Sequence, residues 1–209
     1  MQTKSTSITI LSLNVRGMVS DIKRNKLLSW IRTQKADIVM LQETHCTESR
    51  VKLFKANWDG QSFYGLTDSP HSRGVCILLS PDFNGDVIDV HDRGDGRVLM
   101  LNINICNTSY SITNVYAPNE SYARSSFFEE LKGWVLHNAV SVDNLILGGD
   151  LNCCINDDDR TTRTHCNDKS RQSLKILIQD LRLNDLWQYD SVKKHGNKYT
   201  WQDDKTKSR

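Results

Sequence analysis

The residues best suited to chemistry in this sequence are polar side chains that follow short apolar runs. The runs ITILSLN, IVMLQE, SITNVYAPN and LILGGDLN each close on a carboxylate, an amide or a phenol. These closing residues are Asn14, Glu43, Tyr116, Asn119, Asp150 and Asn152. A strand end is where a rigid scaffold presents side chains to a cleft, so we expect the four ends to converge on one site.

The chemistry of this set is that of a metal-assisted hydrolase. Glu43 and Asp150 are carboxylates, the others are amides and a phenol, and no thiol and imidazole pair suited to covalent catalysis accompanies them. Oxygen ligands of this kind suit a hard cation such as Mg²⁺, with Mn²⁺ as a substitute, which keeps bound waters and grips phosphate oxygens. The sequence therefore predicts hydrolysis of a phosphodiester.

The same residues also have a purely structural interpretation. A polar residue at a strand end commonly forms a turn, which applies to Asn14 and Asn119, and Tyr116 fits an amphipathic wall. Glu43 and Asp150 fit this interpretation less well. A carboxylate directly after a run of apolar residues risks burial unless it is paired or binds a cation.

The elements that must position these residues are short strands and a few helices. Strands are predicted at Ser7–Leu13, Asp37–Leu41, Gly74–Ser80, Arg97–Ile105, Tyr110–Val115 and Asn144–Leu147, with a last one near Tyr199–Trp201. Apolar residues at helical spacing predict helices around Ile22–Ile31, Phe127–Val135 and Leu174–Leu181. Hairpin spacing in the middle and crossover spacing at the flanks predict a mixed α/β fold, with two sheets packed face to face and helices outside.

Composition indicates one domain over residues 1–209 without a strong overall charge. The chain has 27 Lys and Arg against 25 Asp and Glu, so any affinity for nucleic acid must come from local patches. The six cysteines form no CxxC pair and no zinc-finger spacing, so we expect reduced thiols in an intracellular protein. No signal peptide is recognisable, and no run approaches the roughly 20 apolar residues of a membrane span, so we expect no membrane partner.

Four motifs resemble those of the endonuclease/exonuclease/phosphatase superfamily. They are LNVRG (Leu13–Gly17), LQETH (Leu41–His45), NVYAPN (Asn114–Asn119) and GGDLN (Gly148–Asn152), in the family order and with family-like spacing. LQETH and the later DRTTR (Asp159–Arg163) are most similar to the N-terminal endonuclease of LINE-type, non-LTR retrotransposon polyproteins. The resemblance implies a four-layer α/β/β/α sandwich of two mixed sheets flanked by helices.

The resemblance also implies a role for each matching residue. Glu43 would bind the divalent metal with Asn14 beside it, and Tyr116 would hold a phosphate oxygen. Asp150 would orient or deprotonate the attacking water, and Asn152 would donate to the charge that develops on phosphorus. We expect the backbone to pass close to the phosphate at Gly148 and Gly149, which have no side chains.

A second set of residues is expected to bind the substrate DNA. Its members are Asn119, His45, Arg160, Arg163 and Thr200. Each also fits a solvated surface, since His45 follows a strand end and the arginines lie in a loop of mixed charge.

Together these observations predict an endonuclease that nicks double-stranded DNA to prime reverse transcription of a LINE-type element in the nucleus. A reverse transcriptase domain is expected in the full-length polyprotein. The family pattern continues with an aspartate and then an Asp-His pair, so we expect the domain to be incomplete at its C-terminus, with its last strands missing. A catalytically impaired DNA-binding remnant and a phosphatase of the same superfamily are the alternatives, and the DRTTR match favours the nuclease.

Overall fold

The computed structural model describes residues 7–156, 159 and 168–186, and it divides into two compact units. Unit 1 consists of Met1–Ala117 and Asn138–Asp150, and unit 2 consists of Pro118–His137 and Leu151–Arg209. The strand predicted near Tyr199–Trp201 lies outside the described residues.

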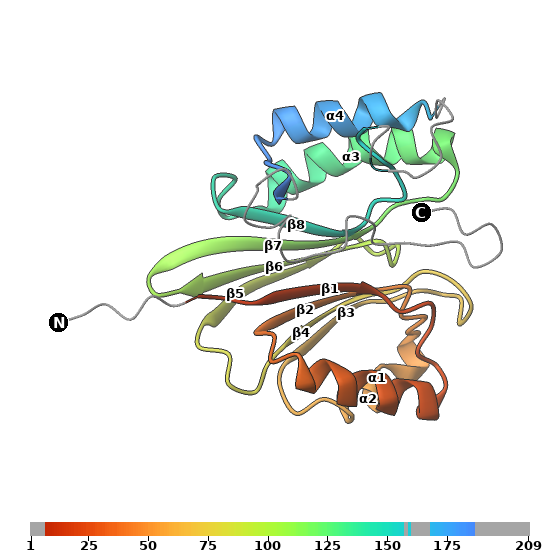
Figure 1. The fold of residues 1–209 in the computed structure, drawn as a ribbon, viewed down its shortest axis with the longest axis vertical. Coiled ribbons are helices and arrows are strands. Elements are labelled where there is room, and N and C mark those ends of the chain that lie inside the picture. Colours follow the sequence, from red (N-terminus) through yellow and green to blue (C-terminus); the bar gives the residue numbers. More distant parts are fainter. Residues whose placement is uncertain (1–6, 157–158, 160–167, 187–209) are drawn as a thin grey trace. The chain divides into compact units, whose positions relative to one another are not determined.

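Unit 1 contains two four-stranded sheets (Figure 1). The first has the order β1-β2-β4-β3, with β1 at Ile10–Asn14, β2 at Ile38–Gln42, β3 at Ser62–Gly65 and β4 at Val75–Leu79. The second has the order β5-β6-β7-β8, with β5 at Asp86–Asp92, β6 at Val98–Ile105, β7 at Thr108–Tyr116 and β8 at Leu145–Asp150. The pairs β1–β2 and β7–β8 are parallel and the other pairs are antiparallel, so both sheets are mixed.

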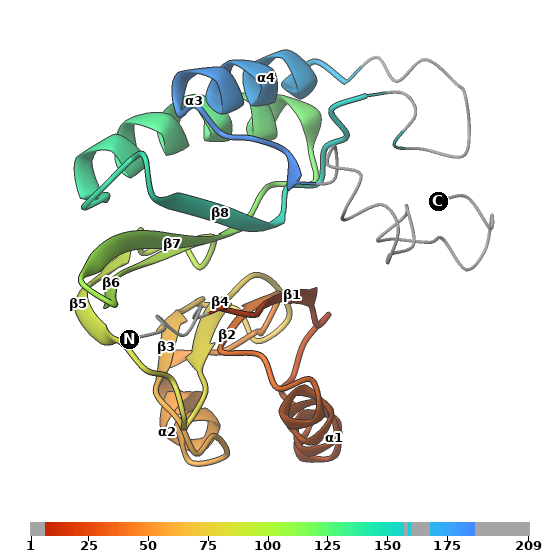
Figure 2. The ribbon, with the colours of Figure 1, turned by 60° about the vertical axis from the view of Figure 1, so that its left-hand side comes forward.

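Helices cover the outer face of the first sheet (Figure 2). The crossover from β1 to β2 is helix α1, Asp21–Thr33, and the 3-10 turn η1, Glu48–Arg50, leads into the short helix α2, Val51–Lys55. Leu28 and Ile31 of α1 and Phe54 of α2 are buried against side chains from one face of β2. Each such side chain stabilises the fold by about 1.5–3 kcal/mol when fully buried.

The second core lies between the two sheets. Ile38 and Met40 of β2 meet Leu101 and Ile103 of β6 there, whereas the alternate residues Val39 and Leu41 face the helices. Because both faces of β2 are covered, every residue of this strand is buried. A central strand of this kind is rigid, and it therefore holds the residue that follows it, Glu43, in a fixed position.

Unit 2 contains α3 (Ser121–Asn138) and α4 (Ser170–Asp180), which lie side by side in both ribbon views (Figures 1 and 2). The buried face of α3 carries Phe127, Phe128, Leu131 and Val135, and that of α4 carries Leu174 and Leu177. Ser125 contacts Ser173 at 2.6 Å, and Lys132 pairs with Asp180 at 2.8 Å. We call these two helices the α3–α4 pair.

The predicted fold class is confirmed, since two mixed sheets and accompanying helices are present. Four elements had no predicted residue range: β3, β5, η1 and α2. β5 is an edge strand with mostly exposed residues and a register shift between Val87 and Asp89, so it lacks the apolar run used to find the others. No helix in the described part of the chain is long and apolar enough to cross a membrane.

Candidate active site

Four of the predicted site residues stand at strand ends within unit 1. Asn14 ends β1, Glu43 follows β2, Tyr116 ends β7 and Asp150 ends β8. The register of the parallel pairs aligns these ends, since Asn14 pairs with Gln42 and Tyr116 pairs with Asp150. Parallel neighbours place their carboxyl ends at one edge, so each sheet presents two of these residues together.

The amide of Asn14 links the carboxylates of the two sheets. Its Nδ2 donates to Glu43 Oε1 and to Asp150 Oδ2, at 2.8 Å in both cases. The side chain of Tyr116 interacts with Glu43 as well, which raises the pKa of its hydroxyl. The structure thus brings together four residues that the sequence separates by up to 136 positions.

The orientation of Asn14 differs from that of a metal ligand. Its Oδ1 accepts from the backbone N–H of Arg16 at 3.0 Å, while its nitrogen faces the carboxylates. A metal ligand would have to present oxygen. Asn14 therefore contacts Glu43 and Asp150 through its nitrogen, and its predicted place at a metal stays a prediction.

The backbone around Glu43 is held in an unusual conformation. Glu43 and His45 have φ of 53° and 58°, in the left-handed region that non-glycine residues seldom adopt. The loops on both sides hold this segment, since Gly17 N–H donates to the Glu43 carbonyl at 2.6 Å and Thr44 N–H donates to the Gly74 carbonyl at 2.9 Å. Such residues cost about 1–3 kcal/mol each and persist where the surroundings determine them, as at functional sites.

His45 lies beside Glu43 rather than in a solvated loop. Its side chain is 15% exposed, and its Nε2 is 3.9 Å from Glu43 Oε2. The ring fills the space next to Gly17, where an added Cβ would lie 2.7 Å from Nδ1. Burial lowers the pKa of His45, and the charge of Glu43 opposes this shift. The predicted contact of His45 with DNA stays a prediction.

Tyr116 is a largely buried phenol with a raised pKa. Burial is the main cause of the shift, and the hydrogen bond and negative charge of Glu43 add to it. The guanidinium of Arg97 lies over the ring, with Cζ 5.3 Å from the centroid. Tyr116 is therefore a neutral hydrogen-bond donor at the edge of the carboxylate cluster.

Of the two glycines before Asp150, Gly149 is required by the backbone of β7, whereas Gly148 faces the movable end of a side chain. A Cβ at Gly148 would lie 2.5 Å from Met40 Cε, and one at Gly149, where φ is 131°, would lie 2.0 Å from the Val115 carbonyl oxygen. Gly148 thus makes room for a side chain of the first sheet, and Gly149 lets β8 approach β7. The expectation that the backbone passes close to a phosphate at these glycines stays a prediction.

A buried polar network behind the site was missed in the sequence. Gln42 Nε2 donates to Asn114 Oδ1 at 2.8 Å, and Asn114 Nδ2 donates to the carbonyls of Leu41 and Cys76 at 2.9 and 2.8 Å. These bonds join the two sheets directly beneath the strand ends. The available signal was the amide of Asn114 inside an otherwise apolar strand, which needs partners when it is buried.

The remaining predicted residues lie in unit 2 or outside the described residues. Asn119 accepts a hydrogen bond at its backbone carbonyl from Arg124 at 2.5 Å, and Asn152 has φ of 49°. Arg160, Arg163 and Thr200 lie outside the described residues.

Unit 2 has its own buried ion pair, which was also missed. Arg124 Nη2 pairs with Asp168 Oδ2, and the two side chains are 5% and 8% exposed. Ser121 and Ser170 donate their hydroxyls to Asp168 Oδ1, each at 2.6 Å. Burial alone would raise the pKa of Asp168, but these hydrogen bonds and that of Arg124 outweigh it and hold the pKa well below its usual range. We call these four residues the Arg124 clasp.

The carboxylate cluster of unit 1 fits a hard divalent cation. Within the described ranges, no group of three or more His, Cys, Asp and Glu residues is arranged to hold a metal by itself. Mg²⁺ does not need such a cage, because it is commonly held by one or two carboxylates, waters and substrate phosphate. Two carboxylates drawn to one amide concentrate the negative charge that such a cation neutralises.

Two relatives of known sequence cover different parts of the chain. The chain is 31% identical over 182 residues to a Xenopus laevis protein described as "Transposon TX1 uncharacterized 149 kDa protein", a match over 87% of this chain and 14% of that protein. It is 29% identical over 128 residues to the DNA repair nuclease APEX1 of Danio rerio, over 56% of this chain and 38% of that protein. The chain thus spans much less than two thirds of both relatives.

Solved structures share the fold at low sequence identity. The endonuclease domain of TRAS1, a telomere-specific non-LTR retrotransposon, matches with a TM-score of 0.62 and 17% identity, over 83% of this chain and 72% of that one. An AP endonuclease from Archaeoglobus fulgidus matches with a TM-score of 0.64 and 17% identity, over 83% and 70%. The model of the Endonuclease/Exonuclease/phosphatase family matches residues 11–203, which include every motif of the site. The chain belongs to the endonuclease/exonuclease/phosphatase family.

Proposed function

We propose that the protein is a divalent-metal-dependent endonuclease that nicks double-stranded DNA for reverse transcription of a LINE-type element. The observation that carries the proposal is the bridge from Asn14 Nδ2 to Glu43 Oε1 and Asp150 Oδ2. It brings two carboxylates to one point, where they suit a hard cation and a phosphodiester. A family of phosphodiester and phosphomonoester hydrolases uses this kind of site.

The names of the relatives support a nuclease acting within a mobile element. One is a transposon protein, one is a DNA repair nuclease, and one is a retrotransposon endonuclease domain. In this proposal the natural partners are double-stranded DNA and a reverse transcriptase domain of the same polyprotein, and the site of action is the nucleus.

Each residue of the site has a defined task in the proposed reaction. A divalent cation, when bound, supplies positive charge to the phosphate oxygens and makes a water easier to deprotonate. Glu43 would hold that cation, preferably Mg²⁺, and Asn14 would keep Glu43 and Asp150 together. Asp150 would orient the attacking water and accept its proton at the carboxylate. Tyr116 would donate a hydrogen bond from its hydroxyl to a phosphate oxygen.

Asn152 completes the proposed set. Its amide would donate to the negative charge that develops on the phosphate oxygens, a role that requires no change of protonation. The neutral state of Tyr116 supports its role as a donor, since burial and Glu43 raise its pKa.

The test is conversion of supercoiled plasmid to nicked circles with Mg²⁺, with Mn²⁺ and with excess chelator. We expect Glu43→Gln and Asp150→Asn each to lower the single-turnover rate by about 100-fold or more, the scale expected for losing metal charge or water activation. Glu48→Gln and Asp143→Asn are matched controls, because they make the same chemical changes at exposed carboxylates nearby. Both controls should retain the rate.

The outcomes separate the alternatives. Nicking that persists in excess chelator would contradict the dependence on a divalent metal. Near-normal rates in both site variants would mean that the active site lies elsewhere. Release of phosphate from small phosphorylated compounds without nicking would identify a phosphatase. Binding of duplex DNA without any cleavage would identify a remnant that has lost turnover.

A further inference from the structure

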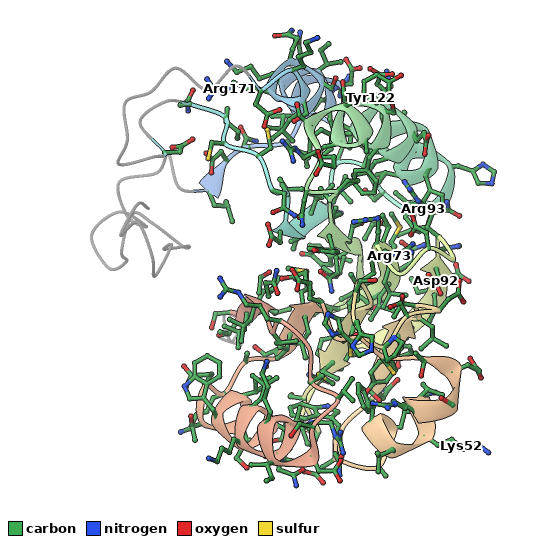
Figure 3. The ribbon with its side chains drawn as sticks, turned by 90° about the vertical axis from the view of Figure 1, so that its right-hand side faces the viewer. Lys52, Arg73, Asp92, Arg93, Tyr122 and Arg171 are labelled. Carbon is green, nitrogen blue, oxygen red and sulfur yellow. The ribbon has the colours of Figure 1, made fainter. Side chains whose placement is uncertain are left out.

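Three arginines gather around Asp95 in the turn that precedes β6. Arg93 Nε and Nη2 contact Asp95 Oδ2 at 2.9 and 2.6 Å, and Arg73 Nη1 donates to the Asp95 carbonyl at 3.3 Å. The backbone N–H of Arg97 donates to Asp95 Oδ1 at 3.0 Å. Figure 3 shows Arg73 and Arg93 together with Asp92 on this side of unit 1. Asp95 therefore fixes both the turn and the backbone of Arg97.

Arg97 is in turn joined to Tyr116 by three contacts. Its Cζ lies 5.3 Å from the centroid of the Tyr116 ring, and its Nη1 donates to the Tyr116 carbonyl at 3.1 Å. The backbone N–H of Tyr116 donates to the Arg97 carbonyl at 2.8 Å. Tyr116 in turn interacts with Glu43, so these contacts link the turn to the carboxylate cluster.

We propose that Arg97 is a positioning residue, which fixes the ring of Tyr116 by stacking on it and so directs the hydroxyl to the reacting phosphate. The inference rests on the proposed function, because it assigns Arg97 a task in the same reaction. A planar guanidinium can stack on a ring and donate a hydrogen bond from its edge at once, which the ammonium of lysine cannot do. The Asp95 carboxylate holds the backbone of Arg97 in register for this contact.

A direct contact of Arg97 with the DNA backbone is the competing explanation. A phosphate contact acts through charge, contributes to binding and weakens with salt. A positioning contact acts through geometry and changes the rate of the bound complex. Lysine would largely replace arginine in the first case and only poorly in the second.

The kinetic test is a double-mutant cycle between Arg97 and the Tyr116 hydroxyl. We expect Arg97→Gln to lower the single-turnover rate by about tenfold or more, because a misplacement of about 1 Å can cost about 100-fold. Arg97→Lys should restore little of this loss, and the Kd for DNA should stay unchanged. In a Tyr116→Phe background, which keeps the ring and removes the hydroxyl, Arg97→Gln should have no further effect. The control is Arg32→Gln, which removes a guanidinium that lies 5.4 Å from the centroid of the Trp58 ring and should act equally in both backgrounds.

A second readout does not depend on activity. Fluorotyrosine incorporated into the full chain reports on all six tyrosines by fluorine NMR, and the Tyr116 signal is the one that Tyr116→Phe removes. Arg97→Gln should shift or broaden that signal, and Arg32→Gln should leave it in place. If no version of the protein nicks DNA, the proposed function fails while this signal still decides the role of Arg97.

Three results would overturn the positioning role. The first is an equal rate loss from Arg97→Gln with and without the Tyr116 hydroxyl. The second is weaker DNA binding that Arg97→Lys restores. The third is a Tyr116 fluorine signal that Arg97→Gln does not change.

Discussion

Removing the cation of the Arg124 clasp should destabilise unit 2 severely. The perturbation is Arg124→Met, which keeps an unbranched side chain of similar length and removes the guanidinium. Arg124 donates to Asp168, to Ser170 Oγ at 2.7 Å and to the backbone carbonyls of Pro118 and Asn119 at 2.9 and 2.5 Å. In the variant, each of these acceptors loses the hydrogen bond that Arg124 donates.

The magnitude follows from the burial of the pair. Arg124 and Asp168 are 5% and 8% exposed, so the carboxylate cannot regain full hydration once the guanidinium is gone. Breaking a buried ion pair by removing one partner typically costs about 3–5 kcal/mol. Three hydrogen bonds to Asp168 remain, from Ser121 and from the hydroxyl and N–H of Ser170, which favours the lower half of that range.

The assay is urea unfolding of the variant, followed by hydrogen exchange of the α3–α4 pair. The matched control is Lys132→Met, which breaks the ion pair with Asp180 between the same two helices. Those side chains are 40% and 39% exposed, and pairs of that exposure contribute about 0–1 kcal/mol. We expect the Arg124 variant to lose several times more stability and to exchange faster in both helices.

Two results would refute this reasoning. If Arg124→Met lowers the free energy of unfolding no more than Lys132→Met does, burial does not set the strength of the pair. Faster exchange in unit 1 with no change in the α3–α4 pair would equally contradict the assignment of the clasp to unit 2.

The remaining predictions concern stability. Asn114→Ala should cost about 3 kcal/mol or more in urea unfolding, because several buried groups lose their partner at once and each unpaired group costs about 1–3 kcal/mol. Gly149→Ala should lower Tm more than Gly133→Ala, since a Cβ at Gly133 would meet nothing within 4 Å, whereas at Gly149 it would meet the β7 backbone. The pKa of Asp168 is lower in the folded state, so its stabilisation is fully present above the unfolded pKa of about 3.9 and is lost as pH falls further. The free energies of unfolding of the protein and of Asp168→Asn should therefore converge at acid pH. A difference between them that does not change with pH would contradict the lowered pKa.

The site residues of unit 1 could be predicted because their signal is local. Each of Asn14, Glu43, Tyr116 and Asp150 follows an apolar run, and such a run places the next polar residue at a strand end. Parallel pairing of β1 with β2 and of β7 with β8 then aligns those ends. The orientation of the Asn14 amide, with its nitrogen toward the carboxylates, has no such local signal. It depends on the N–H of Arg16, which donates to the amide oxygen.

Long-range partners could not be predicted in the same way. Asp168 binds Arg124 across 44 positions, and Asn114 reaches Leu41 across 73. Which side chains from distant parts of the sequence meet is determined only by the packed structure. The packing constraint at Gly149 was missed for the same reason, because the atom that an added Cβ would meet belongs to Val115. Edge strands such as β3 and β5 lack a fully buried face, so periodicity alone does not reveal them.

The confinement of Asn14, Glu43, Tyr116 and Asp150 to unit 1 bears on how relatives of this protein can diverge. Substitutions that accumulate in unit 2 leave untouched the hydrogen bonds that hold the carboxylates, since those bonds are made within unit 1. A lineage can thus change the sequence of unit 2 while it inherits these contacts of unit 1. Divergence of the one unit and retention of the contacts in the other are then separate evolutionary events.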